Sequence, residues 1–398
     1  MSAAVAPEPD VPALLVVLPP AGEDIAGSPA ALTLLGLPVL TRVVRAAERA
    51  GYERVLVAGG EAAAARLAGT GARPLEGAGR LDPARGPWRL ILLAAGVIPQ
   101  ADWLRRLRTM PLEPAHVFLD EAAAALDTRD PLAVTARAVG AGGLAGLLAA
   151  LGPDVKAADG RADPAGRFVL ASLADARPAE RWLLQSLVKD REGFMSRRVE
   201  RRLSLALTRR LAATRVSPNA VTFVSLAIGL GSAPFFLSAA APWQVAGALL
   251  LLAHSILDGC DGELARLKFL QSRLGAVLDF WGDNVVHMAV FACMGLGWHW
   301  ASASPLPLVA GGAAVAGTLL ATAMLHRWQP ESRAPHAGAA AAGWLVERFA
   351  HRDFIYLVLA LATGGRAWWF LVPAAAGIPL FLLALGWTGG LRRAGRPA

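Results

Sequence analysis

Hydrophobic and polar positions follow different patterns in the two halves of the chain. Up to about Asp190, charged residues occur throughout, and no apolar run is long enough to cross a bilayer. After Ser217, apolar runs of spanning length follow one another. A mean hydropathy of +0.44 with 18% charged residues fits this division, because the first value is high for a soluble protein and the second is high for a chain that is all membrane. We therefore expect a soluble region followed by a membrane region.

Short apolar strands alternate with helical segments in the first half. From Ala13 the segments are, in order, ALLVVLP, LPVLTRVVRAAERAG, ERVLVAGG, EAAAARLAG and WRLILLAAG. A strand in HVFLD follows, and GRFVLASLADARPAERWLLQSLVKDREG reads as a final strand and helix. This alternation predicts a parallel α/β sheet. We place a flexible tail at 1–12 and the α/β domain at 13–190. The opening MSAAVAPEPDVPA has no basic region typical of a signal peptide, so we expect the soluble domain to stay in the cytosol.

The second half predicts an all-α domain of six membrane-spanning helices over 217–390, followed by a basic tail at 391–398. The predicted spans are 218–240, 243–267, 274–300, 305–327, 350–365 and 367–389. The loops SAAAPW, ASASPLP and TGGRA carry a single arginine between them, whereas ARLKFLQSR, HRWQPESRAPH, ERFAHRD and LRRAGR are basic. Because basic loops stay in the cytoplasm, we expect both termini on the cytoplasmic side of the membrane.

Residues 191–216 predict a juxtamembrane amphipathic helix, since RRVERRLSLALTRRLAATR has arginine clusters with leucines between them. Such a helix suits an anionic leaflet, and a solvated helix with no membrane role is the alternative. Ser217 is expected to cap the first spanning helix, and Pro218 to open it.

The net charge of +8 changes this picture little, because the basic residues cluster beside the membrane segments, where they set topology and contact anionic lipids. The sequence shows no nucleic-acid motif, so no nucleic-acid partner is expected. The two cysteines, Cys260 and Cys293, lie in predicted membrane helices without metal-ligand spacing, which predicts neither a disulfide nor a thiolate site.

Four carboxylates lie within these apolar surroundings, in the run DGCDGELARLKFLQSRLGAVLDFWGD. Asp258 and Asp261 share one helix face, and Asp279 and Asp283 share a face of the next helix. Buried ionised carboxylates pair with cations, and oxygen-only ligands select Mg²⁺ or Mn²⁺. Four carboxylates are enough to hold two such ions. Arg266 supplies a fork of donors suited to a phosphate oxygen.

The run resembles the signature of the CDP-alcohol phosphotransferase family, D-x2-D-G-x2-A-R-x8-G-x3-D-x3-D. The matching positions are Asp258, Asp261, Gly262, Ala265, Arg266, Gly275, Asp279 and Asp283. The resemblance implies that Asp258, Asp261 and Asp279 are metal ligands, and that Asp283 is both the general base and a contact of the second metal ion. It also implies a nucleotide site bordered by Gly262, Ala265, Arg266 and Gly275.

Two further sets of residues are candidates for substrate contacts. Asn219 and Thr222 are similar to family residues beside the nucleotide, although helix capping alone would also explain this segment. The basic residues at the cytosolic ends of later helices are candidates for the acceptor or its phosphate, and membrane anchoring is the alternative for each: Lys268, Arg327 and Arg352.

The order of elements in the first half looks like the nucleotidyltransferase fold of sugar-phosphate cytidylyltransferases, a Rossmann-like α/β fold. Its expected phosphate-binding loop, G-x-G-T-R, is absent after Leu18, no lysine precedes Pro38, and AAGVIP stands where a metal-binding aspartate is expected. We therefore predict a domain without that activity. Asp120 and Glu121 could in principle hold a metal ion, but a loop pair of this kind is usually solvated. The whole organisation is similar to the archaeal bifunctional inositol-phosphate cytidylyltransferase and di-inositol-phosphate-phosphate synthase, with its first activity lost.

The resemblance implies an integral-membrane transferase that moves a substituted phosphate from a CDP-alcohol to an acceptor alcohol or lipid and releases CMP. CDP-diacylglycerol is slightly favoured as donor over CDP-inositol, and a homodimer is compatible with this reading. A carrier of divalent cations that uses the same carboxylates is one alternative. Another is a bifunctional enzyme that keeps cytidylyltransferase activity. A scaffold in which the soluble domain recruits a partner enzyme to the membrane is compatible with the transferase.

Overall fold

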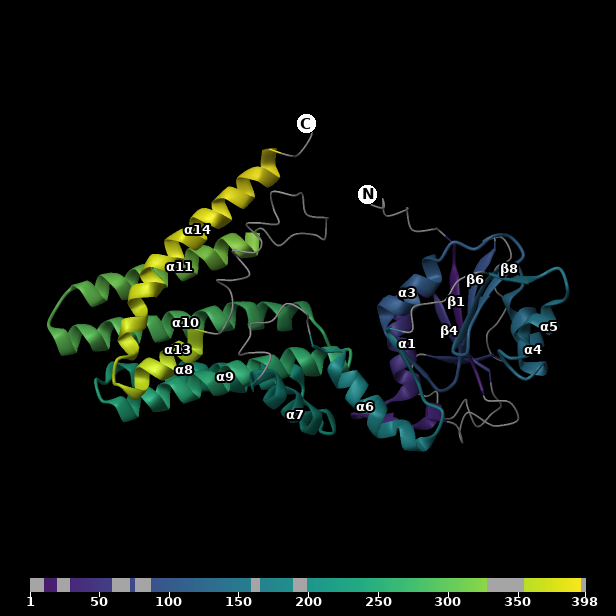
Figure 1. Ribbon diagram of the computed structural model, residues 1–398, viewed down its shortest axis with the longest axis horizontal. Helices are drawn as coiled ribbons and strands as arrows, with labels where there is room; N and C mark the ends of the chain where they lie inside the picture. The colour runs from purple at the N-terminus through teal and green to yellow at the C-terminus, as the bar shows by residue number, and fades with distance from the viewer. Residues whose placement is uncertain are drawn as a thin grey trace. The chain divides into compact units, whose positions relative to one another are not determined.

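The chain folds into two compact units, Met1–Gln185 and Ser186–Ala398, each described here by itself. A computed structural model of the chain describes residues 11–19, 29–58, 72–75, 87–158, 165–188, 199–327 and 354–394. The first unit mixes strands and helices, and the second is helical (Figure 1). The expected succession of an α/β region and a helical region is therefore confirmed.

The first unit is built around a sheet with the strand order β10-β8-β9-β6-β1-β4-β5 among the described residues. Two short ladders, β11-β7 and β2-β3, accompany it. Its strands are β1 (Ala13–Leu18), β2 (Thr33–Leu34), β3 (Leu37–Pro38), β4 (Arg54–Val57), β5 (Arg73–Pro74), β6 (Trp88–Ala94), β7 (Val97–Pro99), β8 (His116–Leu119), β9 (Ala123–Thr128), β10 (Lys156–Ala157) and β11 (Arg167–Val169). Its helices are η2 (Pro29–Ala31), α1 (Val39–Arg49), α3 (Ala101–Thr109), α4 (Pro131–Gly140), α5 (Leu147–Leu151), η5 (Leu173–Asp175) and α6 (Ala176–Gln185).

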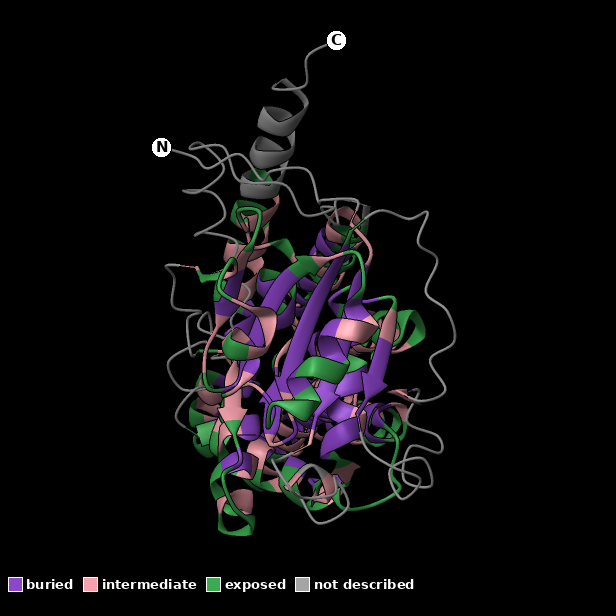
Figure 2. Ribbon diagram, turned by 90° about the vertical axis from the view of Figure 1, so that its right-hand side faces the viewer, coloured by how far each residue is buried: buried purple, intermediate pink, exposed green. Residues whose placement is uncertain are grey.

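The central strands of the sheet are buried, which accounts for their unbroken apolar sequences. All six residues of β1 are buried, and β1 pairs in parallel with β4 and with β6 (Figure 2). The expectation of an all-parallel sheet is wrong at one strand, because β9 runs antiparallel to both β6 and β8. The chain reverses direction between β8 and β9 over a short turn, whereas a parallel pair needs a crossover of a dozen or more residues.

Asp120, the loop acid considered as a metal ligand, holds this turn together. Its Oδ1 accepts hydrogen bonds from the backbone N–H groups of Ala122 and Ala123, at 2.8 and 2.9 Å. Its Oδ2 accepts from Arg167, which also lies 3.6 Å from Glu121. These contacts give both acids a structural role. The expected helix EAAAARLAG and the segment in which a phosphate loop was sought after Leu18 lie largely outside the described residues.

The described residues of the second unit form a series of helices. They are α7 (Arg201–Ala212), α8 (Pro218–Ser232), η7 (Ala233–Leu237), α9 (Ala241–Leu267), α10 (Arg273–Ser302), α11 (Leu306–Arg327), α13 (Phe354–Thr363), η8 (Ala367–Phe370) and α14 (Leu371–Ala394). Ser217 caps α8 by accepting a hydrogen bond from the Ala220 N–H at 3.2 Å, with Pro218 in the first turn. Both predictions for this helix start are confirmed.

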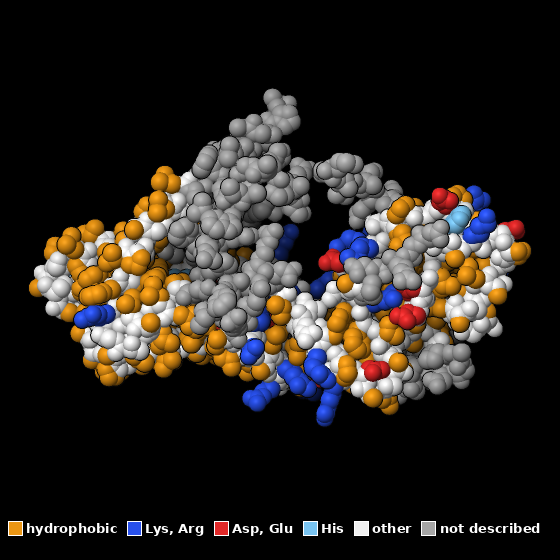
Figure 3. Space-filling model, viewed as in Figure 1, with side chains coloured by type: hydrophobic (Ala, Val, Ile, Leu, Met, Phe, Trp, Pro, Cys, Tyr) orange, Lys and Arg blue, Asp and Glu red, His pale blue; other side chains and the backbone are white. Residues whose placement is uncertain are grey.

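Several of these helices are suited to a lipid environment. Within the described part of the chain, three are long and apolar enough to cross a membrane, namely Pro218–Leu237, Ala241–Leu267 and Leu306–His326. Phe354–Thr363 and Ala367–Leu383 are shorter apolar helices. The side chains visible over these helices in Figure 3 are mostly hydrophobic. Together, these features are those of a membrane protein.

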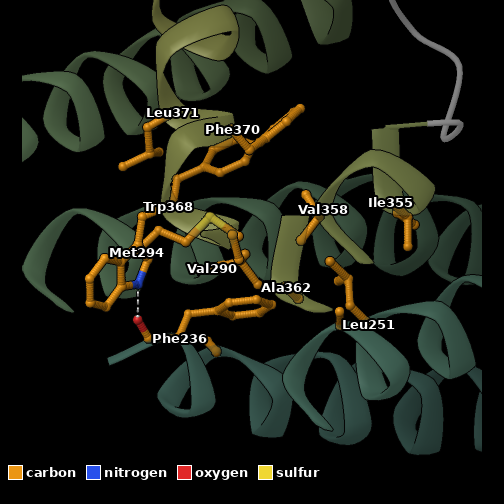
Figure 4. Close-up of a cluster of buried hydrophobic side chains, with 14 of the residues drawn as sticks. Phe236, Leu251, Val290, Met294, Ile355, Val358, Ala362, Trp368, Phe370 and Leu371 are labelled. Atoms are coloured by element: carbon orange, nitrogen blue, oxygen red, sulfur yellow. Dashed lines mark hydrogen bonds between the residues drawn. The ribbon is translucent and has the colours of Figure 1, made fainter. Parts of the chain in front are cut away.

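An apolar core ties the helices together at the end away from the carboxylates. Phe236, Leu251, Met294 and Val358 meet there from η7, α9, α10 and α13 (Figure 4). Trp368 joins this cluster and donates a hydrogen bond from Nε1 to the Phe236 carbonyl at 2.5 Å. The core fixes α9 and α10 against one another and so determines where their polar ends lie.

Candidate metal centre

Three carboxylates converge between α9 and α10. Asp258, Asp261 and Asp279 each offer an oxygen atom, and these atoms all lie within 4.8 Å of one another. Asp258 and Asp261 are only 6% and 4% exposed. Negative charges brought this close in a buried site repel one another unless a cation or protons neutralise them. The oxygen-only donor set suits a hard divalent ion such as Mg²⁺ or Mn²⁺.

Helix geometry explains why the α9 carboxylates point the same way. Residues three and four apart on a helix lie on one face, so Asp258, Asp261 and Ala265 share a face of α9. Asp279 reaches the same place from α10, which begins at Arg273 directly after its N-cap Ser272. The Ser272 hydroxyl caps that helix by accepting from the Gly275 N–H at 2.9 Å.

The α8 helix supplies a hydroxyl to this cluster. Thr222 donates a hydrogen bond to Asp261 Oδ2 and also lies 3.2 Å from the Pro218 carbonyl oxygen. Thr222, a candidate nucleotide contact, thus bonds to one of the clustered carboxylates in the structure. A hydrogen bond of this kind fixes the plane of a carboxylate and the direction in which its other lone pairs point.

Asp283, the fourth carboxylate of the signature, lies against two histidines. Its Oδ1 is 3.3 Å from His254 Nε2 on α9 and 4.0 Å from His287 Nε2 one turn along α10. His254 in turn contacts Ser225 of α8 through Nδ1, at 2.8 Å from the hydroxyl oxygen. Neither histidine belongs to a motif in the sequence, so the pattern gave no signal for either residue.

The remaining nucleotide candidates lie around the start of α10 and the end of α9. A Cβ atom on Gly275 would lie 3.1 Å from Asn219 Oδ1, so the glycine lets α8 and α10 approach closely. A Cβ atom on Gly262 would lie 3.3 Å from Arg266 Nη1, so the Arg266 guanidinium lies along this face of α9. The candidates Asn219, Gly275, Gly262 and Arg266 therefore lie near the end of α9 and the start of α10, the two helices that carry the acids.

Of the three candidates for the acceptor site, the structure describes only the side chain of Lys268. Lys268 donates a hydrogen bond from Nζ to the Thr214 carbonyl at 2.7 Å, which ties the end of α9 to the segment after α7. Arg327 is the last residue of α11, and its side chain lies outside the described part of the chain. Arg352 lies outside the described residues altogether.

A buried glutamate on the opposite face of α9 was missed in the sequence. Glu263 is 0% exposed and accepts hydrogen bonds from Arg201, from Ser204 at 2.6 Å and from Thr208 at 2.6 Å. All three donors lie on α7, so this carboxylate fastens α7 to the helix that carries Asp258 and Asp261. An acidic residue off the aspartate face of an otherwise apolar helix was the signal that could have revealed it.

The second unit has the features of a helical membrane protein with an acidic candidate metal centre between two of its helices. The family follows from comparison with known proteins. Residues 215–379 match the family model described as CDP-alcohol phosphatidyltransferase, and this part of the chain is a domain of that family. The resemblance inferred from the signature is thereby confirmed.

Two relatives share one name. A bifunctional IPC transferase and DIPP synthase of Rubrobacter xylanophilus is 37% identical over 224 residues, covering 55% of this chain and 46% of that protein. Its counterpart in Archaeoglobus fulgidus is 36% identical over 123 residues, covering 31% of this chain and 24% of that protein. The chain thus spans less than half the length of these relatives. Among solved structures, Mycobacterium tuberculosis phosphatidylinositol phosphate synthase (PgsA1) with CDP-DAG bound has a TM-score of 0.33 at 18% identity, covering 46% of this chain and 94% of that one.

Proposed function

We propose that the helical unit catalyses transfer of a substituted phosphate from a CDP-alcohol to an acceptor alcohol, with release of CMP. The observation that carries this proposal is the convergence of Asp258, Asp261 and Asp279 in a domain that matches the CDP-alcohol phosphatidyltransferase family. A buried acidic cluster alone would also serve a cation carrier. The Arg266 guanidinium beside Gly262 favours the transferase, because a carrier needs no phosphate-binding fork.

The three clustered aspartates would hold the divalent ion, and Asp283 would contact a second one. A bound divalent ion neutralises charge on the diphosphate and on the departing CMP. The surrounding residues would border the cytidine diphosphate: Gly262, Ala265, Arg266, Gly275 and Asn219. Thr222 orients Asp261 within this set. Lys268, Arg327 and Arg352 remain candidates for the acceptor side.

Asp283 takes the proton in this reaction. The acceptor oxygen forms a bond to the phosphorus that bears the transferred alcohol, and the bond from that phosphorus to the bridging oxygen breaks. CMP leaves with the bridging oxygen, and the proton of the acceptor hydroxyl passes to the Asp283 carboxylate. The Asp283 carboxylate is half-buried and lies one helical turn after Asp279 on α10. This position suits a base that serves a site at the edge of the bilayer.

The Asp283→Asn variant tests this assignment. An amide cannot accept the proton, so we expect turnover to fall by at least about a hundredfold while much of the CDP-alcohol affinity remains. Turnover is followed as CMP release, and affinity as CDP-alcohol binding without an acceptor. Equal losses of turnover and of donor affinity would remove the base assignment.

The finer architecture is part of the proposal. We infer six spans, formed by α8 with η7, α9, α10, α11, α13 and η8 with α14, with both termini and the active site on the cytoplasmic side. Arg266, Lys268 and Arg273 around the α9–α10 turn support that side under the positive-inside rule. The α/β unit would be a nucleotidyltransferase-like domain without that activity, since its phosphate-loop motif and catalytic cation are missing from the sequence. A homodimer is compatible with this arrangement.

The donor is either CDP-diacylglycerol or a CDP-inositol-type polyol. The first is favoured slightly by the resemblance in the signature. The second gains support from the shared name of the two relatives, bifunctional IPC transferase and DIPP synthase. The two donors differ in where their alcohol lies, since diacylglycerol stays in the bilayer and inositol is soluble. Separate assays with each donor distinguish them.

A further inference from the structure

His254 joins three helices beside the candidate base. It is 0% exposed and lies on α9 one turn before Asp258. Its Nε2 faces Asp283 Oδ1 of α10 at 3.3 Å, and its Nδ1 faces Ser225 of α8, at 2.8 Å from the hydroxyl oxygen and 3.0 Å from the carbonyl oxygen. Each nitrogen of the ring therefore has a protein contact, one with α8 and the other with α10.

The direction of the hydrogen bond to Asp283 follows from the partner. An ionised carboxylate only accepts hydrogen bonds, so His254 Nε2 must carry the proton that lies between them. On the other side of the residue, Ser225 donates its one hydroxyl proton to the His254 carbonyl oxygen at 3.0 Å, and its hydroxyl oxygen lies 2.8 Å from Nδ1. The ring is thus held at Nδ1 and donates at Nε2.

Close packing prevents the ring from turning away. A Cβ atom on Gly229 of α8 would lie 2.9 Å from His254 Cγ and 2.7 Å from Val286 Cγ2. Only a residue without a side chain leaves room for the imidazole at this crossing of α8, α9 and α10. The slot keeps His254 Nε2 directed at Asp283.

His287 approaches the same carboxylate but does not hold it in the same way. Its Nε2 lies 4.0 Å from Asp283 Oδ1, beyond hydrogen-bond distance, and its ring packs against Phe291 and Phe354, with centroid distances of 6.4 and 5.1 Å. His254 is therefore the histidine that sets the orientation of the carboxylate.

We propose that His254, anchored by Ser225, is a positioning residue that orients the Asp283 carboxylate toward the hydroxyl of the acceptor alcohol. The inference rests on the proposed function, in which Asp283 takes the acceptor proton. A base held within hydrogen-bond reach of its proton works faster than one that rotates freely, and outer-shell partners of this kind contribute about 10–100-fold. The contacts of His254 with Ser225 and with Asp283 thus link α8, α9 and α10 beside the proposed base.

Two amide substitutions separate the contacts of His254. In His254→Asn the amide can replace Nδ1 and keep the contact with Ser225, but it does not reach Asp283. In His254→Gln the amide reaches the position of Nε2 and can still donate to Asp283. We expect kcat for CMP release to fall about 10–100-fold in His254→Asn and to recover for the most part in His254→Gln. The Kd of the CDP-alcohol, measured with Mn²⁺ and without acceptor, should stay within about twofold in both variants.

Two more variants complete the test. His299→Asn is the matched control, because His299 lies at the far end of α10 with its Nδ1 2.7 Å from the Ser304 carbonyl oxygen, and its kcat should equal that of the wild type. Ser225→Ala removes only a hydroxyl, so it reports on the anchor even where a change at His254 prevents folding. We expect Ser225→Ala to lower kcat several-fold, by less than His254→Asn, with the donor Kd unchanged.

The outcomes distinguish this inference from the function on which it rests. Equal kcat in His254→Asn and His254→Gln, or a donor Kd that rises in step with the loss of kcat, would reduce His254 to a packing residue while CMP release by the wild type still supports the proposed function. Wild-type kcat in both His254→Asn and Ser225→Ala would also overturn the inference alone. No CMP release by the wild type, with either donor and any acceptor tested, would overturn the proposed function and this inference with it.

Discussion

At the scale of single residues, two acids of the site, Asp261 and Asp283, each have a polar partner from another helix. Asp261 accepts from Thr222 of α8, whereas Asp283 accepts from His254 of α9. A carboxylate that binds a metal ion or takes a proton must present its lone pairs in one direction, and the partner hydrogen bond sets that direction. The partners are therefore as informative about the site as the aspartates themselves.

Thr222→Val should weaken metal binding without unfolding the protein. The substitution keeps the shape of the side chain and removes the hydroxyl that orients Asp261, so we expect the Kd for Mn²⁺ to rise about 10–100-fold. Thr222→Ser should restore most of the affinity. Binding is followed by titration of the purified protein with Mn²⁺.

Thr318→Val is the control for this change, because the Thr318 hydroxyl bonds to the Ala314 carbonyl of its own helix at 2.8 Å, and its Mn²⁺ affinity should not change. A Thr222→Val protein that binds Mn²⁺ as tightly as the wild type would exclude an orienting role for this hydroxyl.

At the scale of helices, the sequence predicted the two helices that carry the aspartates, but not how those helices pack against α8. The spacing of Asp258, Asp261, Asp279 and Asp283 was readable, because residues three and four apart share a helix face. The contacts of His254 with Ser225 and Asp283 were not, since those residues lie 29 positions away in each direction and meet only through the packing of three helices. A sequence pattern predicts which residues share the face of one helix, but not which residues of different helices meet.

Contacts between elements also explain two features that the sequence did not predict, namely the hydrogen bonds of α7 to Glu263 and the antiparallel pairing of β9. Arginine clusters in α7 indicated an amphipathic helix, but not that Ser204 and Thr208 on its other face bond to a buried glutamate. The strand β9 is rich in alanine, which favours helices, so its antiparallel place between β6 and β8 had no local signal.

Glu263→Ala should release α7 from α9. The change leaves the half-buried Arg201 guanidinium without this carboxylate and two α7 hydroxyls without their acceptor, and breaking a buried charged contact costs about 3–5 kcal/mol. Cys260 reports on the interface, since it is fully buried and its thiol lies 3.4 Å from the Ser204 carbonyl oxygen. In a Cys293→Ser background, we expect Cys260 to react with a maleimide at least about tenfold faster in Glu263→Ala.

The exposed Arg45–Glu48 pair provides the comparison for this substitution. Its nitrogen and oxygen lie 2.9 Å apart with both side chains nearly half exposed, so Glu48→Ala should leave the labelling rate unchanged. Equal labelling rates in Glu263→Ala and the wild type would show that α7 does not depend on this carboxylate.

Two glycines of α8 provide a matched test of helix packing. A Cβ atom on Gly229 would lie 2.7 Å from Val286 and 2.9 Å from His254, whereas a Cβ atom on Gly231 would meet nothing within 4 Å. We expect Gly229→Ala to destabilise the helical unit by about 1–3 kcal/mol through overpacking. Gly231→Ala should be neutral or stabilise it by up to about 1 kcal/mol, because alanine favours the helix. Thermal unfolding in detergent, followed by helical circular dichroism, compares the two, and equal melting temperatures would contradict this packing.

At the scale of the whole molecule, the chain combines a mixed α/β unit with a helical membrane-type unit. The family match covers residues 215–379, all within the helical unit. The α/β unit has its own buried sheet, and its acidic pair at Asp120 and Glu121 is engaged by Arg167. The catalytic proposal therefore depends on the helical unit, and the α/β unit is proposed as an accessory without nucleotidyltransferase activity.

The most direct measurement is CMP release by the purified full chain in detergent, with Mg²⁺ or Mn²⁺, a panel of acceptor alcohols, and either CDP-diacylglycerol or CDP-inositol as donor. We predict CMP release with one of these donors, its loss on metal chelation, and its loss in Asp258→Asn, because the clustered carboxylates would no longer hold the ion. CMP release that persists in chelator and in Asp258→Asn would contradict the assignment of the metal centre. No CMP from either donor, in protein shown to bind Mn²⁺, would contradict the transferase and favour a carrier of divalent cations.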